Sequence, residues 1–169
     1  MTKTMRTIWV AGALIAAGMA TPAGHAQPSH SEARTVEGVW FVAVTPRNCA
    51  TGAQVAPPID SMVTFHPGGT LSEAPAALAF APGQRLNGMG TWRHHGGHNY
   101  QQRFAALIAF TTPPAPPAPG FEAGWQEVEQ TVELIDADTL RSSGTNAFYR
   151  KDGSLYRTGC STATLRRFQ

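Results

Sequence analysis

The sequence predicts an all-β fold, an eight-stranded antiparallel up-and-down barrel, and three observations point to it. Pro and Gly are frequent, 13 and 17 of 169 residues, and no long window keeps the apolar stripe of a helix. Runs with strand character follow one another, mostly joined by short turns, which is typical of an antiparallel meander. Two cysteines lie beside the first and the last of these runs, which a closed meander brings together.

The N-terminal residues 1–26 have the order of a secretory signal peptide. Lys3 and Arg6 precede an apolar run at 8–20, and small residues end the segment at Ala26. A membrane anchor is the alternative, but a spanning helix needs about 20 apolar residues and this run is shorter. We therefore expect cleavage after Ala26, no membrane anchor in the cleaved protein, and a periplasmic or secreted location.

The remaining chain is expected to hold a flexible N-terminal segment at 27–35 and one barrel domain at 36–169. The whole chain has 13 basic and 11 acidic residues. Removal of the signal peptide with Lys3 and Arg6 makes the numbers of basic and acidic residues equal. The basic residues are scattered rather than clustered. This pattern gives no basic face of the kind that binds nucleic acid.

The strands are expected where apolar and polar residues alternate between turn signals. We place them at 36–45, 59–66, 70–74, 85–93, 99–111, 125–135, 139–150 and 154–168. Eight such strands can close into a barrel, which removes exposed sheet edges and can enclose one small ligand. A two-sheet sandwich with a filled core is the alternative.

In a meander, the connections after odd-numbered strands share one end of the barrel. That end would carry the segments 46–58, 75–84, 112–124 and 151–153, which include every long loop. The other three connections, the turns at 67–69 and 136–138 and the histidine hairpin, would lie at the other end. We interpret the first end as the mouth of a binding protein and the second as its closed bottom.

The cysteine count favours one disulfide, Cys49–Cys160, because an exported chain meets an oxidising compartment. Two free thiols are the alternative. Cys49 follows the first strand and Cys160 lies early in the last, so the bond would join the barrel at its seam. If the cysteines face each other, the residue numbers of paired positions on the first and last strands add up to 209, which places Trp40 opposite Gln169.

The first strand opens with Glu-Gly-Val-Trp, in which Gly38 precedes Trp40 by two positions. This Gly-x-Trp pattern resembles the opening of the lipocalins and the wider calycin barrels. The resemblance implies that Trp40 closes the bottom of the barrel beneath a basic residue from the chain's end. Arg166 and Arg167 stand at the matching place, and the expected pairing favours Arg167, in a cation–π contact. The Thr-Asp-Tyr motif of the classical lipocalins is absent, so the chain is lipocalin-like rather than a classical member.

Alternation places a set of apolar and polar side chains inside the barrel, where they would line a ligand cavity. Gly88 and Gly90 share a face with Trp92, and this arrangement either leaves a hollow beside the indole or lets the strand bend sharply. Polar inward positions would orient a ligand, and Ser142 is one of them. The other cavity candidates are Trp40, Phe65, Gly88, Gly90, Trp92, Gln102, Phe104, Gln130, Asn146 and Phe148.

Three histidines, His94, His95 and His98, surround a Gly96-Gly97 turn signal. His94 and His98 could face each other and bind zinc or copper weakly, but a tight site needs further ligands. No carboxylate lies nearby in sequence. We therefore interpret this stretch as a solvated hairpin and expect no metal and no cofactor.

The chain lacks the common catalytic motifs, including the Gly-x-Ser-x-Gly elbow and His-Glu-x-x-His. The leading hypothesis is an exported barrel that binds a small apolar ligand. One alternative is a secreted inhibitor or interaction protein that acts through its loops. The other is a cyclase or isomerase acting on a hydrophobic substrate, as the allene oxide cyclase-like barrels do.

Overall fold

The computed structural model describes residues 35–76, 79–115 and 119–169, so the expected signal peptide lies outside the described residues. Every regular element described is a strand. The strands are β1 (Gly38–Arg47), β2 (Ile59–His66), β3 (Thr70–Pro75), β4 (Arg85–Gly96), β5 (Asn99–Ile108), β6 (Gly124–Asp136), β7 (Thr139–Arg150) and β8 (Leu155–Arg167). The described part of the chain contains no helix with the length and apolar character needed to cross a bilayer.

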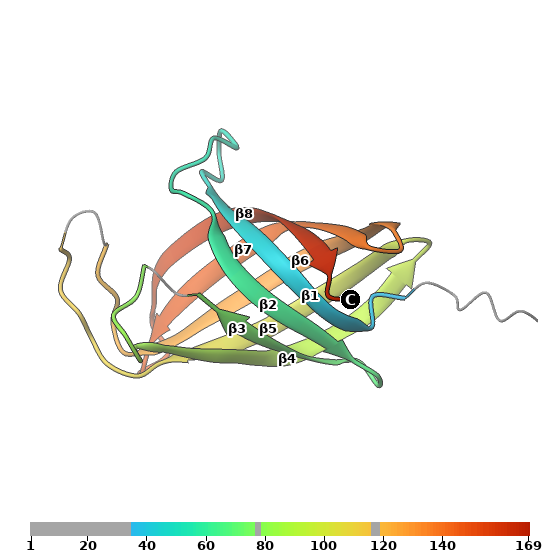
Figure 1. Cartoon of the computed structure of the whole chain (residues 1–169). Coiled ribbons are helices and arrows are strands. Elements are labelled where there is room, and N and C mark those ends of the chain that lie inside the picture. The colour runs from blue at the N-terminus through green and yellow to red at the C-terminus, as the bar shows by residue number, and fades with distance from the viewer. Residues whose placement is uncertain (1–34, 77–78, 116–118) are drawn as a thin grey trace, which may run out of the picture. The chain divides into compact units, whose positions relative to one another are not determined.

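The eight strands form one closed barrel in which each strand pairs antiparallel with its neighbours in the chain. β1 pairs with both β2 and β8, and the second pairing closes the sheet (Figure 1). The predicted up-and-down barrel is therefore confirmed, and the two-sheet sandwich is excluded. Closure leaves no long unpaired edge that could recruit another strand.

Long and short connections lie at opposite ends of the barrel. In Figure 1 the loops after β1, β3 and β5 lie toward the left and upper left, and the tight hairpins β2–β3, β4–β5 and β6–β7 lie toward the right. We call these the loop end and the hairpin end. The same order was expected from the meander, because successive connections alternate between the two ends.

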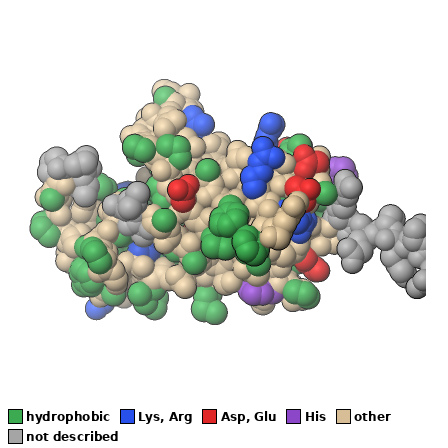
Figure 2. All heavy atoms as spheres, in the orientation of Figure 1, with side chains coloured by type: hydrophobic (Ala, Val, Ile, Leu, Met, Phe, Trp, Pro, Cys, Tyr) green, Lys and Arg blue, Asp and Glu red, His purple; other side chains and the backbone are tan. Residues whose placement is uncertain are grey.

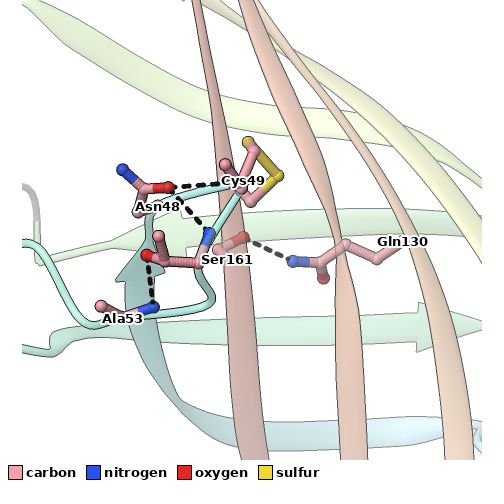
Figure 3. Close-up of a disulfide and its surroundings, with 8 residues drawn as sticks. Asn48, Cys49, Ala53, Gln130 and Ser161 are labelled. Carbon is pink, nitrogen blue, oxygen red and sulfur yellow. Dashed lines mark hydrogen bonds between the residues drawn. A yellow bond between two sulfur atoms is a disulfide. The ribbon is translucent and has the colours of Figure 1, made fainter.

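The disulfide between Cys49 and Cys160 is formed, with the two Cα atoms 5.1 Å apart (Figure 3). The expected strand register was wrong by two residues, because Trp40 pairs with Arg167 rather than with Gln169. β1 ends at Arg47, and Cys49 therefore belongs to a turn rather than to the ladder. A shift of two residues keeps every side chain on its expected face.

The turn that carries Cys49 is built by Asn48. Its side-chain oxygen accepts hydrogen bonds from the backbone N–H groups of Ala50 and Thr51, at 2.9 and 3.0 Å. Its own carbonyl accepts the N–H of Gly52 at 2.8 Å. Asx turns of this kind reverse the chain locally. The reversal brings Cys49 back over the outer face of β8 (Figure 3).

β5 ends at Ile108 rather than at residue 111, so the expected strand was three residues too long at this end. Beyond Ile108 the chain turns toward the 79–84 loop, where the N–H of Ala109 donates to the carbonyl of Gln84 at 2.8 Å. Phe110 lies outside the ladder with 43% of its surface exposed. Local alternation does not reveal where a strand leaves the sheet.

The main hydrophobic core fills the hairpin half of the barrel. Its fourteen buried members come from all strands except β4 and from the segment before β1; they are Val36, Trp40, Val42, Val63, Phe65, Leu71, Tyr100, Phe104, Val128, Val132, Leu134, Leu140, Ala163 and Leu165. A second, smaller cluster of Ile108, Phe121 and Phe148 lies at the loop end. The barrel interior between these clusters is the region where a ligand site can be sought.

Candidate functional site

The hairpin end of the interior is sealed by Trp40, which is fully buried. The guanidinium of Arg167 lies over the indole, with its central carbon 4.2 Å from the ring centroid. Arg167 also donates to the carbonyls of Thr35 and Glu37 at 2.9 and 2.7 Å. Arg167 therefore occupies the place proposed for it, above Trp40, and fixes the segment before β1 across this end.

The two glycines of β4 do not leave a hollow. A Cβ atom at Gly88 would lie 2.7 Å from the ring of Phe104 and 2.9 Å from the carboxylate of Glu73. A Cβ atom at Gly90 would lie 2.1 Å from the carbonyl oxygen of Arg103, a contact that no side chain tolerates. Glycine is present at both positions because β5 and its side chains already occupy the space.

Trp92 also lies at the hairpin end rather than near a mouth. Its ring packs edge-on against the ring of Phe65, with the two centroids 6.1 Å apart. The centroid of the Tyr100 ring lies 5.9 Å from that of Trp92. Its indole N–H donates to the carbonyl of His66 at 3.0 Å. Of the predicted cavity residues, Trp40, Phe65, Trp92 and Phe104 thus belong to the apolar core.

A polar layer crosses the barrel within this core, between Tyr100 and Phe104 on β5 and between Val128 and Val132 on β6. Gln102 donates to the side-chain oxygen of Gln130 at 2.7 Å, and Ser142 donates to the same oxygen at 3.0 Å. Gln130 in turn donates to Ser161 at 3.0 Å, a contact drawn in Figure 3. All four side chains are buried. The structure therefore brings together three of the predicted inward polar residues and adds Ser161.

One atom of this layer has no partner. Gln102 is 3% exposed, and its side-chain oxygen is the single buried side-chain N or O atom without a hydrogen bond among the residues described. Leaving a buried acceptor unpaired costs about 1–3 kcal/mol. A donor from a bound molecule or an internal water would remove that cost.

A buried ion pair lies inside the barrel nearer the loop end. Arg85 and Glu73 approach to 2.9 Å, with side chains only 4% and 8% exposed. Ser61 donates to the other carboxylate oxygen of Glu73 at 3.0 Å, and Arg85 donates to Gln126 at 2.7 Å. Both oxygens of Glu73 are therefore engaged, which suits a brace between β2, β3 and β4 better than a general base.

Sequence reasoning missed this pair for two different reasons. Glu73 stands two positions after the buried Leu71, so strict alternation on β3 could have placed it inside. Arg85 lies three positions before the inward-facing Gly88, so alternation alone predicts that its side chain points outward. The β4–β5 register shifts by one residue between Arg85 and Gly88, and this irregularity turns Arg85 inward. Nothing local in the sequence announces such a shift.

The inward side chains of the loop half are partly exposed, unlike those of the hairpin half. Asn146 and Gly159 are partners on β7 and β8, and Gln126 lies opposite Phe148. Val44 and Ile59 are partners on β1 and β2. All of these inward-facing residues except Phe148 are partly exposed to solvent. Solvent therefore reaches the interior from the loop end, where Asn146 and Gln126 offer hydrogen-bonding groups.

Aromatic side chains narrow this opening. Phe121 stacks on Phe80 with the ring centroids 4.0 Å apart, and it lies 5.4 Å from Phe148. The guanidinium of Arg157 lies 4.8 Å from the centroid of Phe121 and donates to the carbonyl of Gly120 at 3.0 Å. Within the described residues Arg157 makes no ion pair. Loop residues and one arginine thus form a partial lid.

Two hollows of the described surface lie on the outside of the barrel. The larger, of about 470 Å³, crosses β6, β7, β8 and β1 and is lined mainly by hydroxyl side chains and by Arg47, Arg141 and Glu133. The other, of about 430 Å³, lies over β4, β5 and β6. Both are polar and open, so neither offers the apolar enclosure that a small apolar ligand requires.

The histidine hairpin differs from its expected geometry. His94 pairs with Tyr100 across the β4–β5 ladder, not with His98, and the two rings lie 5.0 Å apart. The ring of His94 also contacts the carbonyl of Gly97 at 2.8 Å. Across the described ranges, no group of three or more His, Cys, Asp or Glu side chains could hold a metal ion.

The carboxylates whose pKa is lowered lie on the outer surface and in turns. Arg103 approaches Glu127 to 2.8 Å, and this hydrogen bond lowers the pKa of Glu127 below its ordinary value. The backbone N–H of Asp138 lowers the pKa of Asp136 in the same way, and the hydroxyl of Ser154 lowers that of Asp152. These shifts belong to a solvated face and to turns, not to a catalytic site.

No family model matches the chain, and no curated protein matches it. The function must therefore be argued from the barrel itself.

Proposed function

We propose that this protein is an exported, lipocalin-like barrel that holds a small, mainly apolar molecule in the loop half of its interior. The observation that carries the proposal is the contrast between the two halves. The hairpin half is sealed by Trp40, whereas inward residues such as Asn146 and Gly159 are reached by solvent. Burial of apolar ligand surface, at about 25 cal/mol per Å², is the driving force.

The polar groups of the interior suggest what the ligand carries. The unpaired oxygen of Gln102 accepts hydrogen bonds, so the ligand should present a donor such as a hydroxyl. Val44, Ile59 and Phe148 supply apolar walls toward the loop end. An apolar body with one hydroxyl, as in an isoprenoid or fatty alcohol, suits this combination.

Export rests on a separate observation. The disulfide Cys49–Cys160 suits a non-reducing compartment. Residues 1–26 add the order of charged, apolar and small residues that secretory signals share. A periplasmic or secreted protein is the location that agrees with both.

The test compares two adjacent glutamines on opposite faces. Gln102→Leu removes the buried acceptor, whereas Gln101→Leu makes the same change on the outer face. We expect a long-chain alcohol to bind Gln102→Leu roughly tenfold more weakly, the value of about one hydrogen bond, and the matching alkane to bind both variants like the parent. Displacement of a fluorescent apolar probe measures each affinity.

A second pair tests the position of the cavity. At Gly159 a Cβ atom would meet only the end of the Asn146 side chain, at 2.9 Å, so a larger residue can be accommodated. Gly159→Leu should block the interior, whereas Thr158→Leu changes the outer surface. Loss of binding in both variants, or binding weaker than about 100 µM for every alcohol and isoprenoid tried, would refute the proposal.

A further inference from the structure

Arg157 on β8 places a positive charge at the loop end of the interior. It is the ladder partner of Phe148 on β7, and residues paired in this way project from the same face of a sheet. Phe148 is buried in the interior, so the side chain of Arg157 also lies on the inner face. Its guanidinium carbon lies 4.8, 5.8 and 5.6 Å from the ring centroids of Phe121, Phe148 and Tyr156. Three aromatic rings therefore hold this cation in place.

No acidic side chain forms an ion pair with Arg157 in the part of the chain that the structure describes. The three long loops of the loop end provide none, because the segments 48–58, 76–84 and 109–121 contain no charged residue. The short turn after β7 carries one charge of each sign. In Figure 2, most of the acidic side chains in view lie toward the hairpin end. The surroundings of Arg157 are therefore short of negative charge.

The carboxylate of Glu122, which follows Phe121 in the chain, is engaged by a different arginine. Arg150 donates to both of its oxygens, at 2.6 and 2.9 Å. Arg157 itself donates through Nη2 alone, to the carbonyls of Pro119 and Gly120 at 3.3 and 3.0 Å. A guanidinium has five N–H donors, so those on Nε and Nη1 have no partner among the described residues. Arg157 can therefore bind a further acceptor without leaving its place.

We propose that Arg157 selects ligands that carry a carboxylate at the mouth of the barrel. This inference rests on the proposed function and extends it, because it assigns the outer end of the same ligand. Charge-assisted hydrogen bonds from arginine to a carboxylate are roughly twice as strong as neutral ones.

The distance between the two polar ends defines the ligand class. Arg157 lies four residues along β8 from Ser161 of the polar layer, which is roughly 13 Å of extended strand. An alkyl chain of medium length covers this distance, with its hydroxyl at Gln102 and its carboxylate at Arg157. The ligand is thus an ω-hydroxy acid rather than a simple alcohol.

The test compares ω-hydroxydodecanoate with dodecanol, which have the same length and the same hydroxyl but differ at the other end. Displacement of a fluorescent apolar probe measures both affinities. We expect the parent chain to bind the hydroxy acid more tightly than dodecanol. Arg157→Gln should bind the hydroxy acid at least tenfold more weakly than the parent does and bind dodecanol like the parent, whereas Arg157→Lys should keep part of the preference.

Arg141→Gln is the matched control, because Arg141 is exposed on the outer face of β7 and also forms no ion pair among the described residues. Thermal unfolding checks that each variant is folded. If dodecanol binds but the hydroxy acid binds no more tightly, the role of Arg157 is overturned and the proposed function stands. An equal loss for both ligands in Arg157→Gln would also overturn it, because the arginine would then only hold the loop at 119–121. If neither ligand binds the parent chain, the proposed function and this inference are both refuted.

Discussion

At the scale of single residues, the buried pair of Glu73 and Arg85 is the costliest feature of the interior. Two charges removed from water are tolerable only when each satisfies the other. Here Ser61 and Gln126 complete the hydrogen bonds that the pair leaves open. The arrangement ties β2, β3, β4 and β6 together at the level where the apolar core ends.

We predict that Glu73→Gln lowers the free energy of unfolding by about 3–5 kcal/mol, because it leaves the guanidinium of Arg85 buried without a counter-charge. Urea denaturation measures the change. Glu127→Gln is the matched control: it breaks an ion pair whose Arg103 side chain is 65% exposed, and should cost no more than about 1 kcal/mol. Similar losses in the two variants would contradict the structural role given to Glu73.

At the scale of elements, the seam between β1 and β8 is secured in two ways. The ladder pairs the strands from Trp40–Arg167 to Arg47–Cys160, and the disulfide joins the loop after β1 to β8. The ladder supplies the register and the disulfide restricts the unfolded chain. The two contributions can therefore be separated by experiment.

We predict that replacing Cys49 and Cys160 by Ala leaves the barrel folded but less stable. The bond spans 111 residues, and loop-closure entropy sets an upper value of roughly 4–5 kcal/mol for its contribution. Far-ultraviolet circular dichroism reports the fold and thermal unfolding reports the stability. A variant that fails to fold at all would show that the ladder cannot hold the seam without the disulfide.

At the scale of the whole molecule, the barrel divides into a sealed half and an accessible half. Side chains of the first half form one apolar cluster around Trp40, whereas the second half is held by polar groups and by loop aromatics. Local opening needs less free energy where fewer apolar contacts are lost. The ligand proposal places function in the accessible half.

We predict that amide hydrogen exchange follows this division. On β6, the amide of Val132, whose side chain is fully buried, should exchange more slowly than the amide of Gln126 near the opening. The comparison within one strand holds the pairing constant, since β5 and β7 flank both residues. Uniform exchange along β6, or slower exchange at Gln126, would count against two halves of unequal stability.

The sequence by itself determined the fold and the closure. Alternation and turn signals located eight strands, and short connections between consecutive strands require antiparallel neighbours. The positions of Cys49 and Cys160 then predicted which strands meet, and Arg167 was expected above Trp40 from the resemblance to lipocalins. These features follow from local patterns or from chain order, and both are readable from one sequence.

Only the tertiary structure decided how the interior is filled. The Asn48 turn shifted the seam register by two residues, the irregularity in β4 turned Arg85 inward, and the chain's departure after Ile108 moved Phe110 to the surface. Each depends on contacts between segments distant in the chain. The space beside Gly88 and Gly90 is the clearest case, because a missing side chain can mean a cavity or a close neighbour, and only the position of β5 distinguishes the two.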